Sequence, residues 1–282
     1  MKIGIALSGG GMRGIAHAGV LKALEENGIQ VDIIGGTSAG SMVASLYAMG
    51  YKPDEILEKF KENSNKIIGG NRFSIITGMR KIMKKKVALK GFRNGKSIEE
   101  VFEKLAKNKS YDKISSIKMP IVIPTVDIMD AKEYIFTNYI PEEENDTKYI
   151  TDITVGEAVR ASSSFPAVFN LCTIEKHAFM DGGALDNVPV EEVRKQGADK
   201  VIAVKFEEDM IDENSNMMDI VMRTIDIMGN KIIEEKIKQS DFVVNIHTEK
   251  MGLLENKNLD KCFDYGYEAV NNRIEEIKNA LQ

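Results

Sequence analysis

Long apolar runs, cysteines and histidines are scarce in this 282-residue sequence, and each scarcity excludes a class of protein. No stretch approaches the roughly 20 uncharged apolar residues that a membrane-spanning helix needs. The apolar run from Ile3 to Leu7, which follows Lys2, is too short for the core of an export signal and is followed by glycines. We therefore expect a cytoplasmic protein.

The side chains most often used to bind metals are few. Cys172 and Cys262 show neither metal-type spacing nor a disulfide framework, so we expect two ordinary thiols. The sequence has three histidines, which are few for a multi-histidine zinc site: His17, His177 and His247. The sequence therefore predicts no metal and no cofactor.

The charge balance is mildly acidic but uneven along the chain. With 38 Lys and Arg against 43 Asp and Glu, the net charge is -5, so nucleic-acid binding is not implied. Residues 66–96, however, contain ten Lys or Arg and no acid. Hydrophobic residues make up 43% of the chain, which is enough for an ordinary globular core.

The first fifty residues alternate between strand and helix patterns, in the order strand 2–7, helix 14–27, strand 31–35 and helix 38–49. Such an order predicts parallel neighbouring strands with right-handed crossovers. We expect further strands at 121–126, 134–137, 178–180, 201–206 and 242–246, and further helices at 53–61, 97–107, 154–161, 189–195, 217–239 and 260–281. The simplest account is a single α/β domain over residues 1–282, with a variable insertion at about 64–96.

The strongest functional motif lies between the second strand and the second helix, where residues 36–40 read Gly36-Thr37-Ser38-Ala39-Gly40. In a strand-turn-helix setting this pattern is typical of a nucleophile elbow, in which the serine occupies a tight, strained turn. Its hydroxyl then lies at the N-terminus of a helix, where developing negative charge is favoured. A plain turn of small residues is the alternative.

A glycine-rich turn, Gly9-Gly10-Gly11-Met12-Arg13-Gly14, joins the first strand to the first helix. The spacing of its glycines also fits a dinucleotide-binding turn, which needs an acid at the far end of the second strand. Asp32 lies at the near end of that strand, so we favour an oxyanion hole of backbone N–H groups. Arg13 could orient the loop, attract an anionic head group, or be a solvated arginine at the helix start.

The serine needs a base, and Asp181 is a better candidate than any of the three histidines, for which we expect ordinary structural roles. Asp181 ends a short apolar strand, and Gly182 and Gly183 after it let the chain turn close to a ligand. Partial burial beside a hydroxyl makes a carboxylate a better proton acceptor near neutral pH. An ordinary Asp-Gly turn is the alternative.

Together these three motifs resemble the patatin-like phospholipase family. The resemblance extends to the segment Ala161-Ser162-Ser163-Ser164-Phe165-Pro166 and to Asn187 and Pro189 after the Asp-Gly-Gly block. It covers Ile3 to about Val190, roughly two thirds of the chain. Residues 64–96 match nothing in it, and the last third matches only in α/β character.

The resemblance implies a three-layer α/β/α sandwich around a mainly parallel sheet, and hydrolysis of phospholipid or other long-chain esters by a Ser-Asp dyad. Carried over onto this sequence, Ser38 attacks the ester carbonyl and Asp181 accepts the proton of the serine. The backbone N–H groups of Gly9, Gly10 and Gly11 would hold the oxyanion. Two other functions stay open: a phosphate- or nucleotide-binding module that uses Gly9 to Gly14, and an acyltransferase with the same dyad.

The basic segment would suit a substrate at a membrane surface. As a helix it would be amphipathic and could contact anionic lipid at the inner membrane face, with each basic residue contributing about 1 kcal/mol. A lid over the serine and a solvated charged segment are the other roles we consider. The basic residues of the cluster are Arg80, Lys81, Lys84, Lys85 and Lys86. The sequence leaves the oligomeric state unassigned.

Overall fold

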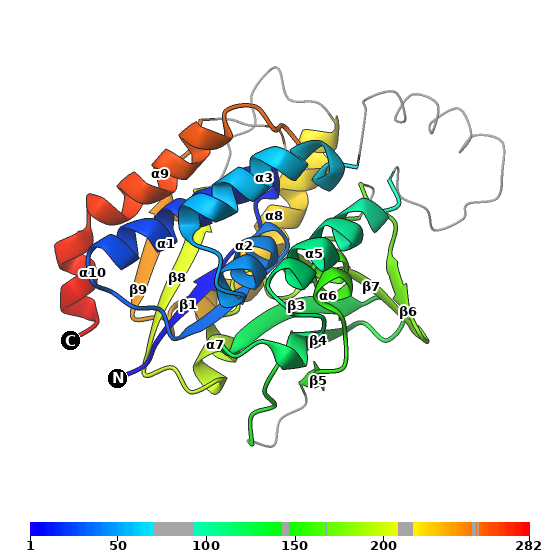
Figure 1. Ribbon diagram of the computed structural model, residues 1–282, viewed down its shortest axis with the longest axis horizontal. Helices are drawn as coiled ribbons and strands as arrows, with labels where there is room; N and C mark the ends of the chain where they lie inside the picture. The colour runs from blue at the N-terminus through cyan, green and yellow to red at the C-terminus, as the bar shows by residue number, and fades with distance from the viewer. Residues whose placement is uncertain (70–92, 143–146, 167, 208–216, 250–251, 253) are drawn as a thin grey trace.

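A mainly parallel sheet runs through the centre of the protein (Figure 1). The computed structural model describes residues 1–69, 93–142, 147–166, 168–207, 217–249, 252 and 254–282. In this part of the chain nine strands form one sheet, ordered β5-β4-β3-β2-β1-β8-β9, with β7 on β3 and β6 on β7. The strands are β1 (Ile3–Leu7), β2 (Ile33–Gly36), β3 (Ile121–Asp127), β4 (Lys132–Thr137), β5 (Lys148–Ile150), β6 (Cys172–Ile174), β7 (His177–Asp181), β8 (Lys200–Phe206) and β9 (Phe242–Ile246).

Helices cover both faces of the sheet. Successive side chains of a strand point to opposite faces, so the apolar strands contribute to a core on each side. In β1, Ile5 and Leu7 enter the larger core while Ala6 enters a second core with Val193 and Ile233. One layer holds α1 (Ala16–Glu26), α2 (Ala39–Ala48), α3 (Pro53–Ile67), α5 (Lys96–Asn108), α6 (Val155–Ser162), α9 (Leu259–Asn271) and α10 (Ile274–Ala280). The other holds α7 (Val190–Lys195) and α8 (Met217–Ile237). The expected three-layer α/β/α architecture is confirmed.

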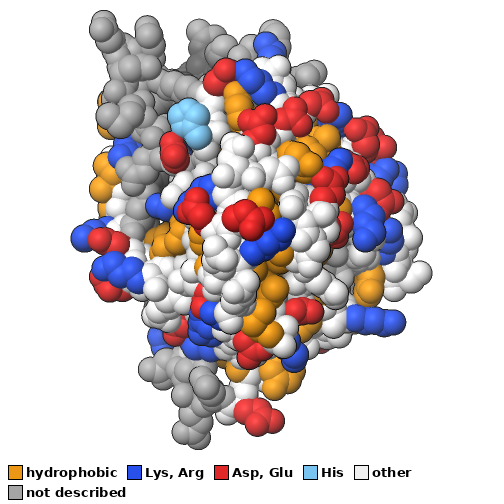
Figure 2. Space-filling model, turned by 90° about the vertical axis from the view of Figure 1, so that its left-hand side faces the viewer, with side chains coloured by type: hydrophobic (Ala, Val, Ile, Leu, Met, Phe, Trp, Pro, Cys, Tyr) orange, Lys and Arg blue, Asp and Glu red, His pale blue; other side chains and the backbone are white. Residues whose placement is uncertain are grey.

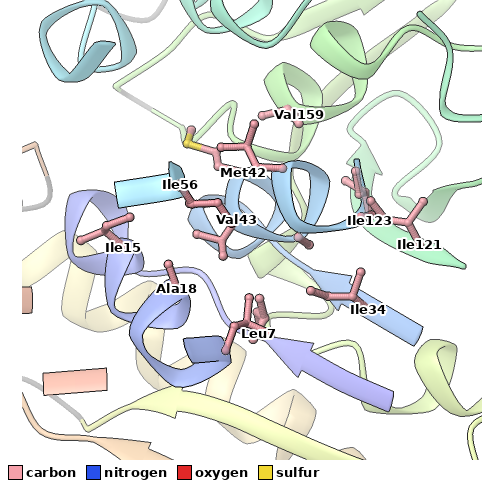
Figure 3. Close-up of a cluster of buried hydrophobic side chains, with 14 of the residues drawn as sticks. Leu7, Ile15, Ala18, Ile34, Met42, Val43, Ile56, Ile121, Ile123 and Val159 are labelled. Atoms are coloured by element: carbon pink, nitrogen blue, oxygen red, sulfur yellow. The ribbon is translucent and has the colours of Figure 1, made fainter. Parts of the chain in front are cut away.

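Helix α2 lies at the centre of the larger core (Figure 3). Its Met42 and Val43 lie among side chains from the sheet, such as Leu7 and Ile34, and from other helices, such as Val159 of α6. Burying one such apolar side chain contributes about 1.5 to 3 kcal/mol. The helix that begins directly after Ser38 is therefore held on every side.

Two strands, β2 and β7, pair with the same edge of β3, one after the other. At its start β3 pairs in parallel with β2, with Gly35 opposite Val122. At its end it pairs antiparallel with β7, with Asp181 opposite Thr125, while β4 occupies the other side of β3. The two pairing sites on β3 are three positions apart, about 10 Å. Along this edge of β3, β2 and β7 therefore run toward each other, and their C-terminal ends lie close together.

The single helix expected over residues 260–281 is wrong, because the chain breaks between α9 and α10. Arg273, at the break, has a φ of -128°. Its guanidinium lies 4.5 Å from the centre of the Phe242 ring and donates to the carbonyl oxygen of Val243 at 3.2 Å. This attachment of Arg273 to β9 turns the chain out of the helix.

The expected insertion is described only at its two ends. Helix α3 continues to Ile67, past its expected end at residue 61, and α5 begins at Lys96. Residues 70–92 lie outside the described residues, and with them the basic cluster of Arg80, Lys81, Lys84, Lys85 and Lys86. The membrane contact and the lid expected for this cluster stay predictions.

Acidic and basic side chains are interspersed on the face at the α9–α10 end of the molecule (Figure 2). Ion pairs connect several of them, such as Arg273 with Glu276 at 2.7 Å and Lys261 with Glu249 at 2.6 Å. Exposed pairs of this kind contribute about 0 to 1 kcal/mol each. They leave charge of both signs on this face.

His17 is a fully buried core histidine in the first turn of α1. Its Nε2 lies 2.8 Å from the carbonyl oxygen of Ser8, which only accepts, so this nitrogen carries the proton. The ring also packs against Phe206, with ring centres 5.1 Å apart. Burial lowers the pKa of His17 to about 4, the Ser8 carbonyl opposes this, and Arg13 lowers the pKa further. His17 therefore stays neutral in the fold.

This histidine makes the fold sensitive to acid. Its pKa is about 6.5 in the unfolded chain and about 4 in the fold, so between these values the unfolded state binds the extra proton. The contribution of His17 to the free energy of unfolding is therefore at its full value above pH 6.5, and it is lost as the pH drops toward 4. We expect a loss of about 2 kcal/mol at pH 4.5 relative to pH 7 that His17→Gln does not show. Urea unfolding of both proteins at the two pH values measures it, and equal losses would contradict the assignment.

Candidate active site

Ser38 is held in a strained backbone conformation between β2 and α2. Its φ is 53° and its ψ is -118°, values that favour glycine, and such a conformation costs a non-glycine residue about 1 to 3 kcal/mol. The glycines of the motif are required by close approach. A side chain on Gly40 would lie 2.4 Å from the carbonyl oxygen of Leu7, and one on Gly36 would lie 2.3 Å from that of Gly40. The local geometry is that of an elbow with a half-buried serine at its tip.

Hydrogen bonds from separate parts of the chain fix this elbow. The N–H of Ser38 donates to Oγ of Ser162 at 3.0 Å. The hydroxyl of Thr37 donates to the carbonyl oxygen of Asp186 at 2.8 Å, and its N–H donates to that of Leu7 at 3.0 Å. The strained turn is therefore tied to β1, to the end of α6 and to the loop after β7.

The glycine-rich turn lies directly against the Ser38 elbow. A side chain on Gly9 would lie 3.3 Å from Cβ of Ser38, and one on Gly14 would lie 2.4 Å from Cβ of Ala39. Gly11 has a φ of 60° and opens a short 3₁₀ helix, η1 (Gly11–Ile15). The turn is thus glycine-rich because backbone must pass close to the serine.

One of the three expected oxyanion donors is already engaged. The N–H of Gly9 donates to Oδ1 of Asn187 at 3.0 Å. Donation by Gly9, Gly10 and Gly11 to a substrate oxygen stays a prediction, and in this structure the Gly9 N–H already has a protein partner. Arg13 lies over the Phe206 ring, 4.8 Å from its centre, and its role in orienting the loop stays a prediction.

Asp181 is the last residue of β7 and is almost fully buried. Its N–H donates to the carbonyl oxygen of Ser164 at 3.1 Å, and its Oδ1 accepts from the N–H of Gly183 at 2.8 Å. The second contact closes a short 3₁₀ turn, η3 (Gly182–Ala184). Ser162 and Ser164, two residues apart, therefore hold Ser38 and Asp181 from one segment.

Asn187 joins the glycine-rich turn to the loop after β7, residues 182–189, which is called the Asp181 loop. Besides accepting from Gly9, its Oδ1 lies 3.2 Å from where a side chain on Gly183 would begin. The sequence marked Asn187 only as part of a family pattern and gave it no role. Ser162, Ser164 and Asp186 likewise carried no functional signal of their own, because their contacts join distant segments.

An apolar cavity of about 160 Å³ opens beside Asp181. Its walls come from β7, from η3, from the segment after α6 and from α8. The lining residues are Phe165, Pro166, Met180, Asp181, Ala184, Met228, Gly229 and Ile232. A mostly apolar cavity with one polar group in its wall is typical of a small-molecule binding site.

The remaining candidates lie away from this point. His177 is bonded to Asp127 at 2.5 Å and stacks on Phe179, while the exposed His247 is bonded to Glu207 at 2.8 Å. Asp32 accepts from the N–H of Ile3 at 2.9 Å, at the start of β1 and so at the opposite end of the strand from the glycine-rich turn. This position counts against a dinucleotide site.

Both cysteines are buried, and neither forms a disulfide bond. Burial raises the pKa of Cys172 to about 12 and that of Cys262 to about 11, so neither is reactive at neutral pH. Within the described ranges, no three His, Cys, Asp or Glu side chains are placed to share a metal ion. No described helix has both the length and the apolar character needed to cross a bilayer.

Comparison with known proteins supports the family resemblance. A family model described as patatin-like phospholipase matches residues 5–194. The chain is 31% identical over 202 residues to lysophospholipase NTE1 of Meyerozyma guilliermondii and 34% identical over 209 residues to that of Candida albicans. Each match covers 72% of this chain and only 12 or 13% of the relative, so the chain spans about an eighth of their length.

Among solved structures, VipD from Legionella pneumophila aligns with a TM-score of 0.48 and 13% identity, covering 98% of this chain and 67% of that one. A human GIVD cytosolic phospholipase A2 complex aligns with a TM-score of 0.48 and 11% identity, covering 99% and 59%. The family assignment rests on the sequence match, which spans the elbow, the glycine-rich turn and the Asp181 loop. On that match, the chain belongs to the patatin-like phospholipase family.

Proposed function

We propose that the protein hydrolyses carboxylic esters of lipids, with Ser38 as nucleophile and Asp181 as the base. The observation that supports the proposal is that β2 and β7 end close together on the same side of β3, because Ser38 follows β2 by two residues and Asp181 is the last residue of β7. The contact of Gly9 with the elbow adds backbone N–H groups at the same place. Nucleophile, base and oxyanion donors are the set that acyl transfer requires.

Acylation would proceed in two steps. Oγ of Ser38 attacks the ester carbonyl carbon while its proton passes to the Asp181 carboxylate, and the N–H groups of Gly10 and Gly11 stabilise the oxyanion. The bond from carbon to the leaving alkoxide then breaks, and Asp181 returns the proton to that oxygen. The acyl group remains on Ser38 as an ester.

Deacylation repeats the steps with water. Asp181 takes a proton from a water molecule, whose oxygen attacks the acyl carbon, and the proton then passes to Oγ as the bond to Ser38 breaks. The products are a free carboxylic acid and the restored serine. An alcohol in place of water would give acyl transfer, so product analysis with added acceptor alcohols distinguishes the two reactions.

The apolar cavity beside Asp181 supports a lipid acyl chain as the substrate group. Its lining is apolar apart from the carboxylate, so polar or charged chains would lose hydration there without gaining partners. The relatives named lysophospholipase suggest a phospholipid or lysophospholipid ester.

The proposal predicts that Ser38→Ala abolishes both labelling by an alkyl fluorophosphonate and ester hydrolysis. Because the alanine has no oxygen to attack, turnover should fall at least about a thousandfold. Asp181→Asn should reduce turnover to a similar extent, since an amide does not accept the proton. Steady-state hydrolysis and mass spectrometry of the probe adduct measure both effects.

Ser45→Ala is the matched control, since Ser45 is a buried serine of the same helix α2, seven residues after Ser38. It should label and hydrolyse like the wild type. Saturable nucleotide binding with no probe labelling would instead favour the phosphate-binding alternative. Full activity in Ser38→Ala would exclude the proposed nucleophile.

A second prediction concerns the link between the glycine-rich turn and the Asp181 loop. Asn187→Ala leaves the N–H of Gly9 without its partner and frees the turn to move. We expect kcat to fall about 10- to 100-fold, because oxyanion donors act only when they are preorganised. Enzyme kinetics on the folded variant measure the change.

Asn138→Ala serves as the comparison for loss of a structural asparagine. Asn138 bonds the carbonyl oxygens of Ile117 and Met119 and accepts from the N–H of Ile121, at the start of β3 and away from the elbow. It should lower the melting temperature without lowering kcat. Equal effects of the two substitutions on kcat would count against a positioning role for Asn187.

A further inference from the structure

Helix α8 forms one wall of the apolar cavity. Within the described residues it packs on α7 and η3. Its inner face carries Gly229, Ile233 and Lys236 at helical spacing. A side chain on Gly229 would lie 3.1 Å from the carbonyl oxygen of Gly183, and Ile233 is fully buried. The cavity-lining residues Met228 and Ile232 are 61% and 46% exposed, so they form the outer edge of the cavity.

Lys236 attaches this helix to a buried carboxyl group. Its Nζ lies 3.4 Å from Oδ2 of Asp186, which is fully buried, and 3.8 Å from Oε2 of Glu133 on β4. Glu191 and Glu192 of α7 also face this cluster, where Lys195 pairs with both at 2.8 Å. Lys236 is therefore the cation that α8 contributes to a buried group of acids.

Lys236 favours the charged forms of the two carboxyl groups beside it. Burial and the neighbouring Glu133 raise the pKa of Asp186, while Lys236 opposes that rise. Burial also raises the pKa of Glu133, and Lys236 again works against it. Although burial disfavours its charge, the carboxyl groups of Asp186 and Glu133 raise the pKa of Lys236, which keeps it an ammonium ion. Removing the lysine leaves two buried acids without the charge that attracts α8.

The Asp181 loop, which carries Asp186, and helix α8 would respond differently to removal of the lysine. The loop keeps its other attachments, because the Asp186 carbonyl oxygen accepts from Thr37 and Asn187 accepts from Gly9. Among its described side chains, helix α8 keeps the packing of Gly229, Ile233 and Ile237. A weakened ion pair should therefore displace the cavity wall and leave the serine elbow in place.

We propose that Lys236 is a positioning residue that sets the acyl-chain preference of the enzyme by holding α8 against the Asp181 loop. This inference rests on the proposed function, since it assigns the cavity beside Asp181 to the acyl chain. A short acyl group reaches the serine without filling the cavity, whereas a long chain needs the α8 wall. Lys236 thus selects for chain length without contacting the reacting atoms.

The test compares a p-nitrophenyl butyrate ester with the palmitate ester in the wild type and in Lys236→Met. We expect kcat/KM for palmitate to fall at least tenfold more than kcat/KM for butyrate, mainly through KM. Lys236→Arg, which keeps the charge, should recover most of the palmitate activity. Lys238→Met is the matched control, because Lys238 lies on the same helix in an exposed pair with Glu235, and it should leave both substrates unaffected.

Hydrogen–deuterium exchange supplies a readout that does not depend on turnover. In Lys236→Met the amides of residues 227–237 should exchange at least tenfold faster, while those of α2 keep the wild-type rate. Asp186→Asn, which removes the other partner, should give the same pattern and serves if the first variant does not fold.

The outcomes separate the two proposals. A wild type that neither labels at Ser38 nor hydrolyses either ester would overturn the proposed function, and the exchange data alone would then decide on the ion pair. Equal losses for both esters, or unchanged exchange in α8, would overturn the role of Lys236 while leaving the dyad intact.

Discussion

The arrangement of the site depends on two strands that share one row of the sheet. β3 is longer than β2, and the free part of its edge is taken by β7, which runs in the opposite direction. Hydrogen bonding to a common neighbour therefore brings the ends of β2 and β7 together, although Ser38 and Asp181 are far apart in the chain. The serines of one short segment strengthen this arrangement, because Ser162 holds the first residue and Ser164 holds the second.

Strain and close approach explain the residues around this meeting point. The backbone of Ser38 is held in a conformation that glycine prefers, and the enclosed helix α2 supplies the packing that maintains it. Gly36 and Gly40 are small because other backbone passes where a side chain would lie, and Gly9 is small because the side chains of Asn187 and Ser38 lie there. Strained backbone persists only where the surrounding structure holds it in place. Here hydrogen bonds to three separate segments hold the turn at Ser38.

Much of this could be predicted from the sequence, and the failures have physical causes. The α/β order, the elbow, the glycine-rich turn and the Asp-Gly-Gly turn are local patterns, so period and turn chemistry show them. The short strands β5 and β6 carry too few residues for a period, and the break at Arg273 depends on its contact with β9. The engagement of the Gly9 N–H by Asn187, and the pairing of Lys236 with Asp186, join residues that only the tertiary fold brings together.

The most direct test of this account is a crystal structure of the enzyme inhibited by an alkyl fluorophosphonate. We expect phosphorus on Oγ of Ser38, a phosphonyl oxygen about 2.7 to 3.1 Å from the N–H groups of Gly10 and Gly11, and the carboxylate of Asp181 within hydrogen-bond reach of Oγ. The alkyl chain should lie along α8. An adduct on another residue, or an Asp181 side chain directed away from the phosphonylated serine, would contradict the convergence on which the account depends.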